Sequence, residues 1–158
     1  MQGPRRAAER PPGMATAGPA YLRWKDEEAI SMLGDAPLVA IIPAADLARA
    51  KSFYTDTLGL ELTDAGAEGD LTFECGGTEF GIYETPSGGQ AAHTLASFKV
   101  PDLDAEMAAL RGKGVVFEEY DLPGLKTVDG VVEAEGMRAA WFKDSEGNIL
   151  CLNERTAG

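Results

Sequence analysis

Six side chains of this sequence could take part in chemistry or ligand recognition. His93, the only histidine, could act as a base or a hydrogen-bond donor, or could simply border solvent at the start of a strand. A cysteine becomes a nucleophile when a cation or a histidine lowers its pKa, but a small buried core residue is the plainer interpretation. Aromatic rings can stack on an aromatic or cationic ligand, and a glutamate adds negative charge. The candidates are His93, Cys151, Tyr83, Tyr120, Trp141 and Glu84.

Other catalytic signatures are missing from the sequence. It contains no GxGxxG, GxxxxGK[ST] or GxSxG pattern, so nothing predicts a dinucleotide site, a phosphate loop or a serine nucleophile elbow. The paired glycines at 76–77 and 88–89 are interpreted as a turn and a linker.

Composition restricts the partners. The formal net charge is -12 and the sequence pI is about 4.4, which argues against nucleic acid and anionic membrane surfaces. The acidity suits a cationic ligand, and it also suits simple solubility. No apolar run approaches the roughly 18 residues of a membrane helix. Two cysteines without a CxxC motif favour reduced thiols, and Arg5-Arg6 is followed by no apolar export segment, so we expect a cytoplasmic protein.

The first 31 residues differ from the rest of the chain. Residues 1–19 are rich in Pro, Gly, Ala and Arg without an apolar period, which predicts a flexible N-terminal extension. Residues 21–33 could form a short amphipathic helix. Met14 and Met32 are both plausible starts, so residues 1–31 could be dispensable.

From residue 36 onward, the same order of secondary-structure elements occurs twice. In residues 36–85, a strand at 38–42 ended by Pro43 precedes a helix capped by Asp46, and strands follow at 60–62, 71–75 and 80–84 around a loop at 64–69. In residues 92–155, a strand at 93–100 precedes a helix capped by Asp102. Strands are expected at 115–118, 137–143 and 149–152. The sequence therefore predicts two strand-helix-strand-strand-strand modules, an α+β fold with helices outside a curved mixed sheet.

The hairpin at 140–154 determines which side chains point into the cleft that such a sheet would enclose. Gly147 ends its turn, and alternation places Leu150 and Leu152 on one face and Cys151 on the other. Within the second module, residues 120–136 form a long irregular segment. We leave three interpretations open for it: a lid that contacts ligand, a surface excursion, or an extra strand pair.

These motifs resemble the vicinal oxygen chelate superfamily, which includes glyoxalase I, bleomycin-resistance proteins, fosfomycin-resistance enzymes and extradiol dioxygenases. The resemblance spans about residues 36–155, through the capped helices at Asp46-Leu47 and Asp102-Leu103 and the FKDSEGN turn at 142–148. It implies paired βαβββ modules and a homodimer. It does not specify a reaction, since the fold hosts isomerases, transferases, dioxygenases and plain binders.

The resemblance also indicates where metal ligands would lie. Metal enzymes of this superfamily carry a His in the first strand of a module and a Glu in the last. The matching positions here are Val39, Gly81, Leu95 and Cys151, and none is His or Glu. One thiolate cannot hold a divalent ion that needs three or four ligands. We therefore expect no metal and no other cofactor.

The sequence thus favours a metal-free protein that binds a small organic molecule, with sequestration of a cationic ligand as one form of this role. Two alternatives stay open. One is a metal-dependent glyoxalase- or dioxygenase-type enzyme with displaced ligands. The other is a cofactor-free isomerase that uses His93 or Cys151.

Overall fold

The computed structural model describes residues 33–66 and 69–156. The helix expected over 21–33 lies outside this range apart from Leu33, as does the rest of the extension. The first module contains β1 (Ala40–Ala44), α1 (Leu47–Ser52), a π-helical turn (Phe53–Thr57), β2 (Glu61–Ala65), β3 (Leu71–Cys75) and β4 (Thr78–Glu84). The second contains β5 (Thr94–Lys99), α2 (Leu103–Gly112), β6 (Asp121–Leu122), β7 (Leu125–Lys126), β8 (Val131–Ala134), β9 (Met137–Lys143) and β10 (Ile149–Arg155).

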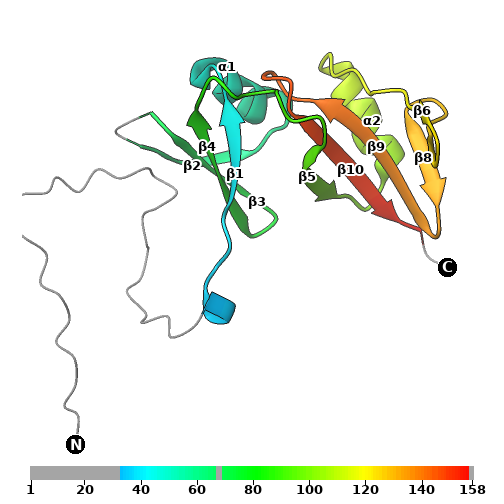
Figure 1. Cartoon of the computed structure of the whole chain (residues 1–158), viewed down its shortest axis with the longest axis horizontal. Coiled ribbons are helices and arrows are strands. Elements are labelled where there is room, and N and C mark those ends of the chain that lie inside the picture. Colours follow the sequence, from blue (N-terminus) through cyan, green and yellow to red (C-terminus); the bar gives the residue numbers. More distant parts are fainter. Residues whose placement is uncertain (1–32, 67–68, 157–158) are drawn as a thin grey trace, which may run out of the picture.

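Two four-stranded mixed sheets lie side by side, each accompanied by one helix (Figure 1). Their strand orders are β1-β4-β3-β2 and β5-β10-β9-β8, and in each the first strand pairs in parallel with the last. The predicted α+β repeat is confirmed. Both helix caps are also as expected, since the Asp46 and Asp102 carboxylates accept hydrogen bonds from Arg49 N and Ala105 N at 2.9 Å.

Alternation along the strands separates two faces of each sheet. One face packs its apolar side chains against the module's helix, and we call the other the helix-distal face. Tyr54, Phe73, Ile82, Leu103, Phe142 and Leu150 are fully buried on the helix side. Tyr54, Phe73 and Phe80 form an aromatic cluster with ring centroids 5.5 to 5.8 Å apart. This burial fixes the strand register and hence the residues displayed on the helix-distal face.

The strand expected at 115–118 is wrong. Only Phe117 forms a bridge, to Phe142, and Val116 is 77% exposed. Instead, β8 pairs with residues 137–140 of β9. The segment at 115–118 therefore pairs with β9 at one position only. The open question about residues 120–136 is answered by extra strands: the hairpin β6–β7 and strand β8.

Several other boundaries also differ from expectation. The first strand begins at Ala40 rather than at residue 38, and the last strand continues to Arg155 rather than ending at residue 152. Pro43 does not end β1, because β1 is an edge strand and a proline without an N–H is tolerated at an open edge. The loop expected at 64–69 begins later, since β2 continues through Ala65. In the described part of the chain, no helix is long and apolar enough to span a membrane.

Candidate functional site

The helix-distal face of the second sheet gathers three of the six candidate side chains. Cys151 of β10 lies opposite Trp141 of β9 and opposite Ser97 of β5. The Trp141 ring meets the Tyr120 ring edge to face, with centroids 5.6 Å apart. Trp141 Nε1 also donates a hydrogen bond to Thr94 Oγ1 at 3.1 Å. The result is a half-buried aromatic pair surrounded by small polar side chains.

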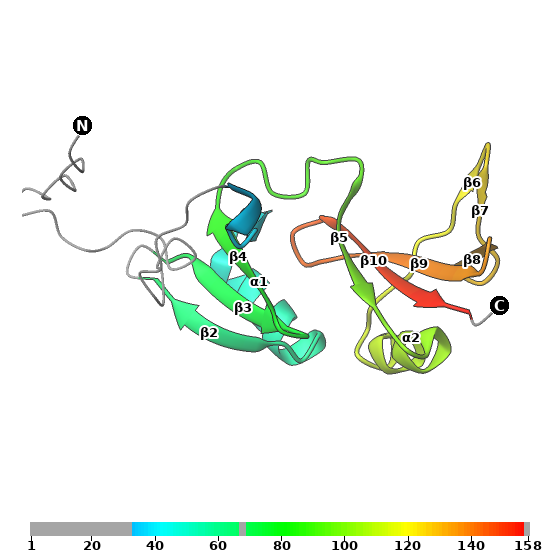
Figure 2. The ribbon, with the colours of Figure 1, turned by 90° about the horizontal axis from the view of Figure 1, so that it is seen from below.

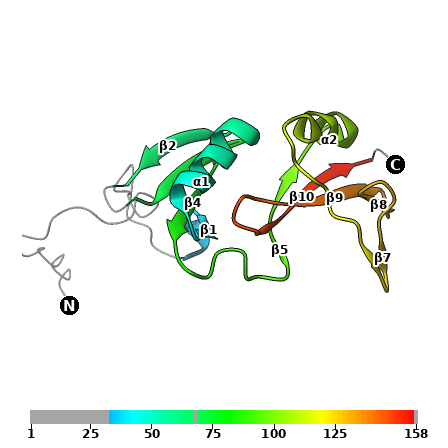
Figure 3. The ribbon, with the colours of Figure 1, turned by 90° about the horizontal axis from the view of Figure 1, so that it is seen from above.

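Tyr120 is positioned by the base of the β6–β7 hairpin. Thr127, which is buried, accepts a hydrogen bond from Tyr120 N at 2.8 Å and donates to Glu119 Oε2. Thr127 N donates to Tyr120 O at 2.9 Å, which closes the hairpin. The hairpin stands out from the second sheet on the side away from α2 (Figures 2 and 3). It thus borders the helix-distal face that carries Trp141.

Cys151 is 6% exposed, and burial raises the pKa of its thiol despite the opposing effect of Ser97 and the Ala140 backbone. The other thiol, Cys75, also has a raised pKa because of burial. Both cysteines are free. A raised pKa keeps the thiol protonated near neutral pH, which disfavours Cys151 as a nucleophile.

The other three candidates lie elsewhere. Tyr83 of β4 is 40% exposed and lies opposite Pro43 on the helix-distal face of the first sheet. Glu84 ends the same strand with an exposed side chain. His93 is exposed and lies just before β5, although the sequence placed it inside the strand. The structure therefore brings Cys151, Tyr120 and Trp141 together and leaves Tyr83, Glu84 and His93 outside that cluster.

A cluster of polar side chains that sequence reasoning did not identify joins the two modules. Asp144 Oδ2 accepts from Tyr54 Oη at 2.9 Å and from Asn148 Nδ2 at 2.8 Å. Asn148 Nδ2 also donates to Pro43 O at 2.8 Å, and Asn148 Oδ1 accepts from Gly89 N at 3.0 Å. Asp144 and Asn148 are buried. The turn that the sequence treated only as a hairpin thus sets the position of one module on the other.

Glu146 extends this contact to the start of α1. Its carboxylate accepts hydrogen bonds from Ala45 N, Asp46 N and the Arg49 guanidinium at 2.8 to 2.9 Å. Burial alone would raise the pKa of Glu146, but the hydrogen bonds, that from Arg49 first, outweigh it and lower the pKa. Glu146 therefore binds the start of α1 as an ionised carboxylate.

This arrangement predicts a pH-dependent contribution to stability. Because the pKa of Glu146 is lower folded than unfolded, its contribution is present above the unfolded pKa and is lost as pH falls through the folded one. Glu146→Gln should lower the free energy of unfolding at neutral pH, and the deficit should shrink below the ordinary glutamate pKa of 4.5. Urea unfolding across this range measures it, with Glu135→Gln at an exposed turn position as the control. A deficit that stays constant with pH would contradict the prediction.

The comparisons with known proteins fit this architecture. A sequence model described as the Glyoxalase/Bleomycin resistance protein/Dioxygenase superfamily matches residues 37–152. The chain belongs to this superfamily. The expected resemblance is confirmed, and the match includes both modules. No curated protein sequence matches the chain significantly.

Solved structures of the superfamily fold resemble the chain. TnmS3, an antibiotic binding protein from Streptomyces sp. CB03234, has 24% identity and a TM-score of 0.61, covering 79% of this chain and 99% of that one. UcmS2 has 22% identity and a TM-score of 0.61, covering 75% and 96%. The fosfomycin resistance protein FosX from Listeria monocytogenes has 16% identity and a TM-score of 0.57, covering 77% and 93%. These similarities establish the fold.

The superfamily's metal positions can now be tested against the strand register. Val39 lies just before β1, while Gly81 lies opposite Ile41, and Cys151 lies opposite Ser97. If the first-strand ligands lay two residues later, their positions would be Ile41 and Ser97. Together with Gly81 and Cys151, these positions would offer an ion only one hydroxyl and one thiol. Within residues 33–66 and 69–156, no three His, Cys, Asp or Glu side chains are grouped so that they could hold an ion. The residues at these positions do not fit a divalent metal.

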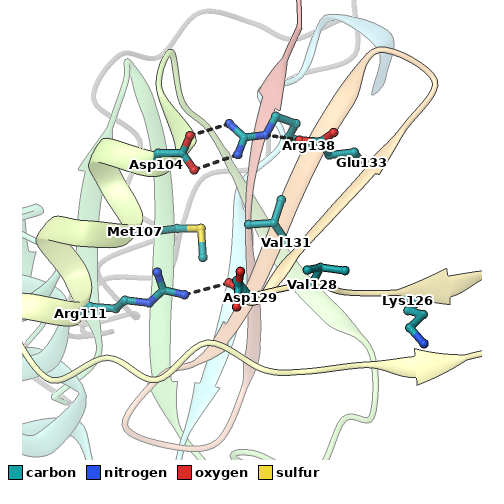
Figure 4. A pocket seen from close by; sticks show the side chains of 9 residues that line it. All are labelled: Asp104, Met107, Arg111, Lys126, Val128, Asp129, Val131, Glu133 and Arg138. Carbon is teal, nitrogen blue, oxygen red and sulfur yellow. Dashed lines mark hydrogen bonds and ion pairs between the residues drawn. The ribbon is translucent and has the colours of Figure 1, made fainter.

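Two cavities that are lined by described residues lie on the helix side of the fold. The larger, about 620 Å³, lies beside α2, where Arg138 is bound by Asp104 and Glu133 (Figure 4). The smaller, about 310 Å³, lies between the modules, where Lys113 Nζ donates to the carbonyls of Asp56 and Thr57. None of the six candidate residues lines either cavity. The charged groups of these cavities are largely paired with one another.

Proposed function

We propose that this superfamily member binds a small organic cation on the helix-distal faces of its sheets, without a metal ion, and sequesters it. The observation that carries the proposal is the Trp141–Tyr120 pair, which presents aromatic rings next to Cys151, one of the positions where the superfamily's metal enzymes have a ligand. Aromatic rings attract organic cations through the negative charge on their faces. The net charge of -12 adds a long-range attraction for the same class of ligand.

Two observations support binding rather than catalysis: the raised pKa of the Cys151 thiol and the location of His93. A thiol with a raised pKa is a weak nucleophile, and His93 lies exposed outside the Trp141 cluster. These features do not favour a cofactor-free isomerase. A metal-dependent enzyme with displaced ligands would need three or more donors grouped around one ion, and His, Cys, Asp and Glu form no such group among the described residues. The similarity to TnmS3, an antibiotic binding protein, is in keeping with a binding role.

We further propose that the protein is a cytoplasmic homodimer. Its two cysteines are free thiols, as is usual in a reducing compartment. Both β1 and β5 are edge strands, and no hydrogen-bonded pairing joins one sheet to the other in the described part of the chain. Open edges of this kind are pairing surfaces, and a second copy would bring further helix-distal surface to the ligand.

A thermal-shift screen tests the function. The chain, freed of metal with a chelator, is heated with a panel of cationic antibiotics that includes metal-free bleomycin, and with neutral and anionic compounds of similar size. We expect cationic aromatic compounds to raise the Tm and the anionic set to leave it unchanged, because only a ligand that binds the folded state stabilises it. Absence of a Tm increase with every cationic compound would refute sequestration of such ligands.

A further inference from the structure

The larger cavity, beside α2, has charged side chains at both ends and apolar side chains between them (Figure 4). Its volume of about 620 Å³ is within the usual range of sites for small molecules. It lies on the helix side of the second module, and neither ring of the Trp141–Tyr120 pair lines it. We call it the α2 cavity.

Three side chains on one face of α2 line the α2 cavity from end to end. Asp104, Met107 and Arg111 are at positions i, i+3 and i+7, so they follow one another along a single face of the helix. A rise of about 1.5 Å per residue separates Asp104 from Arg111 by roughly 10 Å along the axis. Met107 lies between them and faces Val131 of β8 (Figure 4). The helix thus presents an acidic, an apolar and a basic side chain in that order.

The Asp104 end of the cavity has an excess of negative charge. Arg138 forms salt bridges with Asp104 at 2.8 Å, Glu133 at 3.0 Å and Glu154 at 3.1 Å, so one guanidinium is shared by three carboxylates. The Glu133 side chain is 72% exposed, and its carboxylate can accept a further hydrogen bond from a ligand. An ammonium group at this end would reduce the excess of negative charge.

Arg111 lies at the other end without a carboxylate partner. Its guanidinium donates one hydrogen bond to Asp129 O at 2.9 Å, and its Cζ lies 5.3 Å from the centroid of the Phe117 ring. Among the described residues, no carboxylate is within salt-bridge distance of Arg111. Lys126 and Asp129 also line the cavity, but both are exposed and their charges offset each other. The remaining N–H donors of Arg111 can therefore bind a ligand carboxylate.

A tight turn at 128–131 positions Arg111. Val128 N donates to Val131 O at 2.8 Å, and Val131 N donates to Val128 O at 3.1 Å. Between them, Asp129 and Gly130 have φ angles of 54° and 83°, as in the two-residue turns that join strands. This closed turn holds Asp129 O in one place, so the guanidinium that donates to it is also held in place before any ligand binds.

We propose that the α2 cavity binds a linear zwitterion, with the ammonium group at the Asp104 end, the carboxylate at Arg111 and an apolar chain against Met107. An extended tripeptide fits this spacing, since each residue adds about 3.3 to 3.6 Å and three residues span roughly 10 Å. A straight-chain ω-amino acid of similar length has the same two ends. The inference goes beyond the proposed function, because the site lies on the other side of the second sheet from Trp141 and its ligand is not a simple cation.

Calorimetry with the tripeptide Ala-Leu-Ala on the full chain tests the proposal. The N-acetylated peptide lacks the ammonium group, and the C-amidated peptide lacks the carboxylate. We expect the free peptide to bind about tenfold more tightly than either blocked form, because each blocked form loses one charged contact. Titration with ω-aminooctanoic acid distinguishes the sources of such a ligand. Equal affinity indicates that charged ends on an apolar chain are sufficient, whereas tighter binding of the tripeptide indicates a peptide ligand.

Two substitutions assign the ends of the ligand. Arg111→Gln should weaken binding of the free peptide about tenfold and leave binding of the amidated peptide unchanged. Its matched control is Lys99→Gln, which removes one positive charge from an exposed position of β5. Glu133→Gln should weaken binding of the free peptide and leave binding of the acetylated peptide unchanged. Its control is Glu135→Gln at an exposed turn position outside the cavity.

Three results would overturn the proposal. One is that neither Ala-Leu-Ala nor ω-aminooctanoic acid binds, and another is that blocking the ends of the peptide has no effect. The third is that Arg111→Gln weakens the free and amidated peptides equally, as damage to the fold would. None of these results bears on the cationic compounds of the thermal-shift screen, whose proposed site is on the other side of the sheet. Failure of that screen would in turn leave the α2 cavity proposal unchanged.

Discussion

Asn148→Ala should lower the free energy of unfolding by about 3 to 5 kcal/mol, a large share of the stability of a domain of this size. The side chain is fully buried and bonds three segments: β1 through Pro43 O, the linker through Gly89 N, and its own turn through Asp144. Alanine removes one buried donor to Asp144 and leaves the half-buried Pro43 O and Gly89 N without this partner, at a cost of about 1 to 3 kcal/mol for each. Urea unfolding with a constant m-value measures the loss.

Asn153→Ala is the matched control for this prediction. Its amide donates to Ser97 Oγ on the helix-distal face, within a single module and near solvent. We expect a loss of about 1 kcal/mol or less, because water can replace the bond. If the two alanine variants unfold at the same urea concentration, the Asp144–Asn148 cluster does not hold the modules together.

Trp141→Ala should weaken the binding of any cationic aromatic ligand found in the screen by about five- to thirtyfold. The indole lies at the centre of the helix-distal face of the second sheet, between Tyr120 and Thr94. Stacking and cation–π contacts with a partly buried indole contribute about 1 to 2 kcal/mol, and 1.4 kcal/mol is a factor of ten in Kd. Isothermal titration of both proteins with the same compound measures the difference.

Trp141→Phe is the control, since it preserves an aromatic ring and removes the hydrogen bond to Thr94. We expect it to bind more tightly than Trp141→Ala and more weakly than the wild type. Circular dichroism of each variant checks that the sheet is intact. Equal affinity of the wild type and Trp141→Ala would place the ligand away from this face.

The parts of the fold that depend on local sequence could be predicted. Asp46 and Asp102 cap their helices because an aspartate needs only the next turn to satisfy its carboxylate. The bounds of β3 and β9 are also as expected, since each strand borders a glycine turn: Gly76-Gly77 follows β3, and Gly136 precedes β9. Alternation correctly separated Cys151 from Leu150 and Leu152.

The features that were missed depend on contacts between distant residues. Whether residues 115–118 or residues 131–134 pair with β9 is decided by competition for one strand edge, which no local pattern records. Arg49 and Glu146 are 97 residues apart, and their pairing requires the relative placement of both modules. The alignment of Glu61, Glu74 and Glu79 on three neighbouring strands appears only after the register of those strands is known. The sequence signal for the inter-module contact was the density of acidic and amide side chains in the 144–148 turn.

The most direct test of the metal-free account is a pair of calorimetric titrations of one cationic ligand from the screen. One titration uses protein treated with chelator, and the other uses the same protein after incubation with Zn²⁺, Ni²⁺, Fe²⁺ and Mn²⁺ and removal of the excess. Elemental analysis accompanies each. We predict equal Kd values and far less than one metal ion per chain. One tightly held equivalent of metal, with ligand binding only in the loaded protein, would contradict the account.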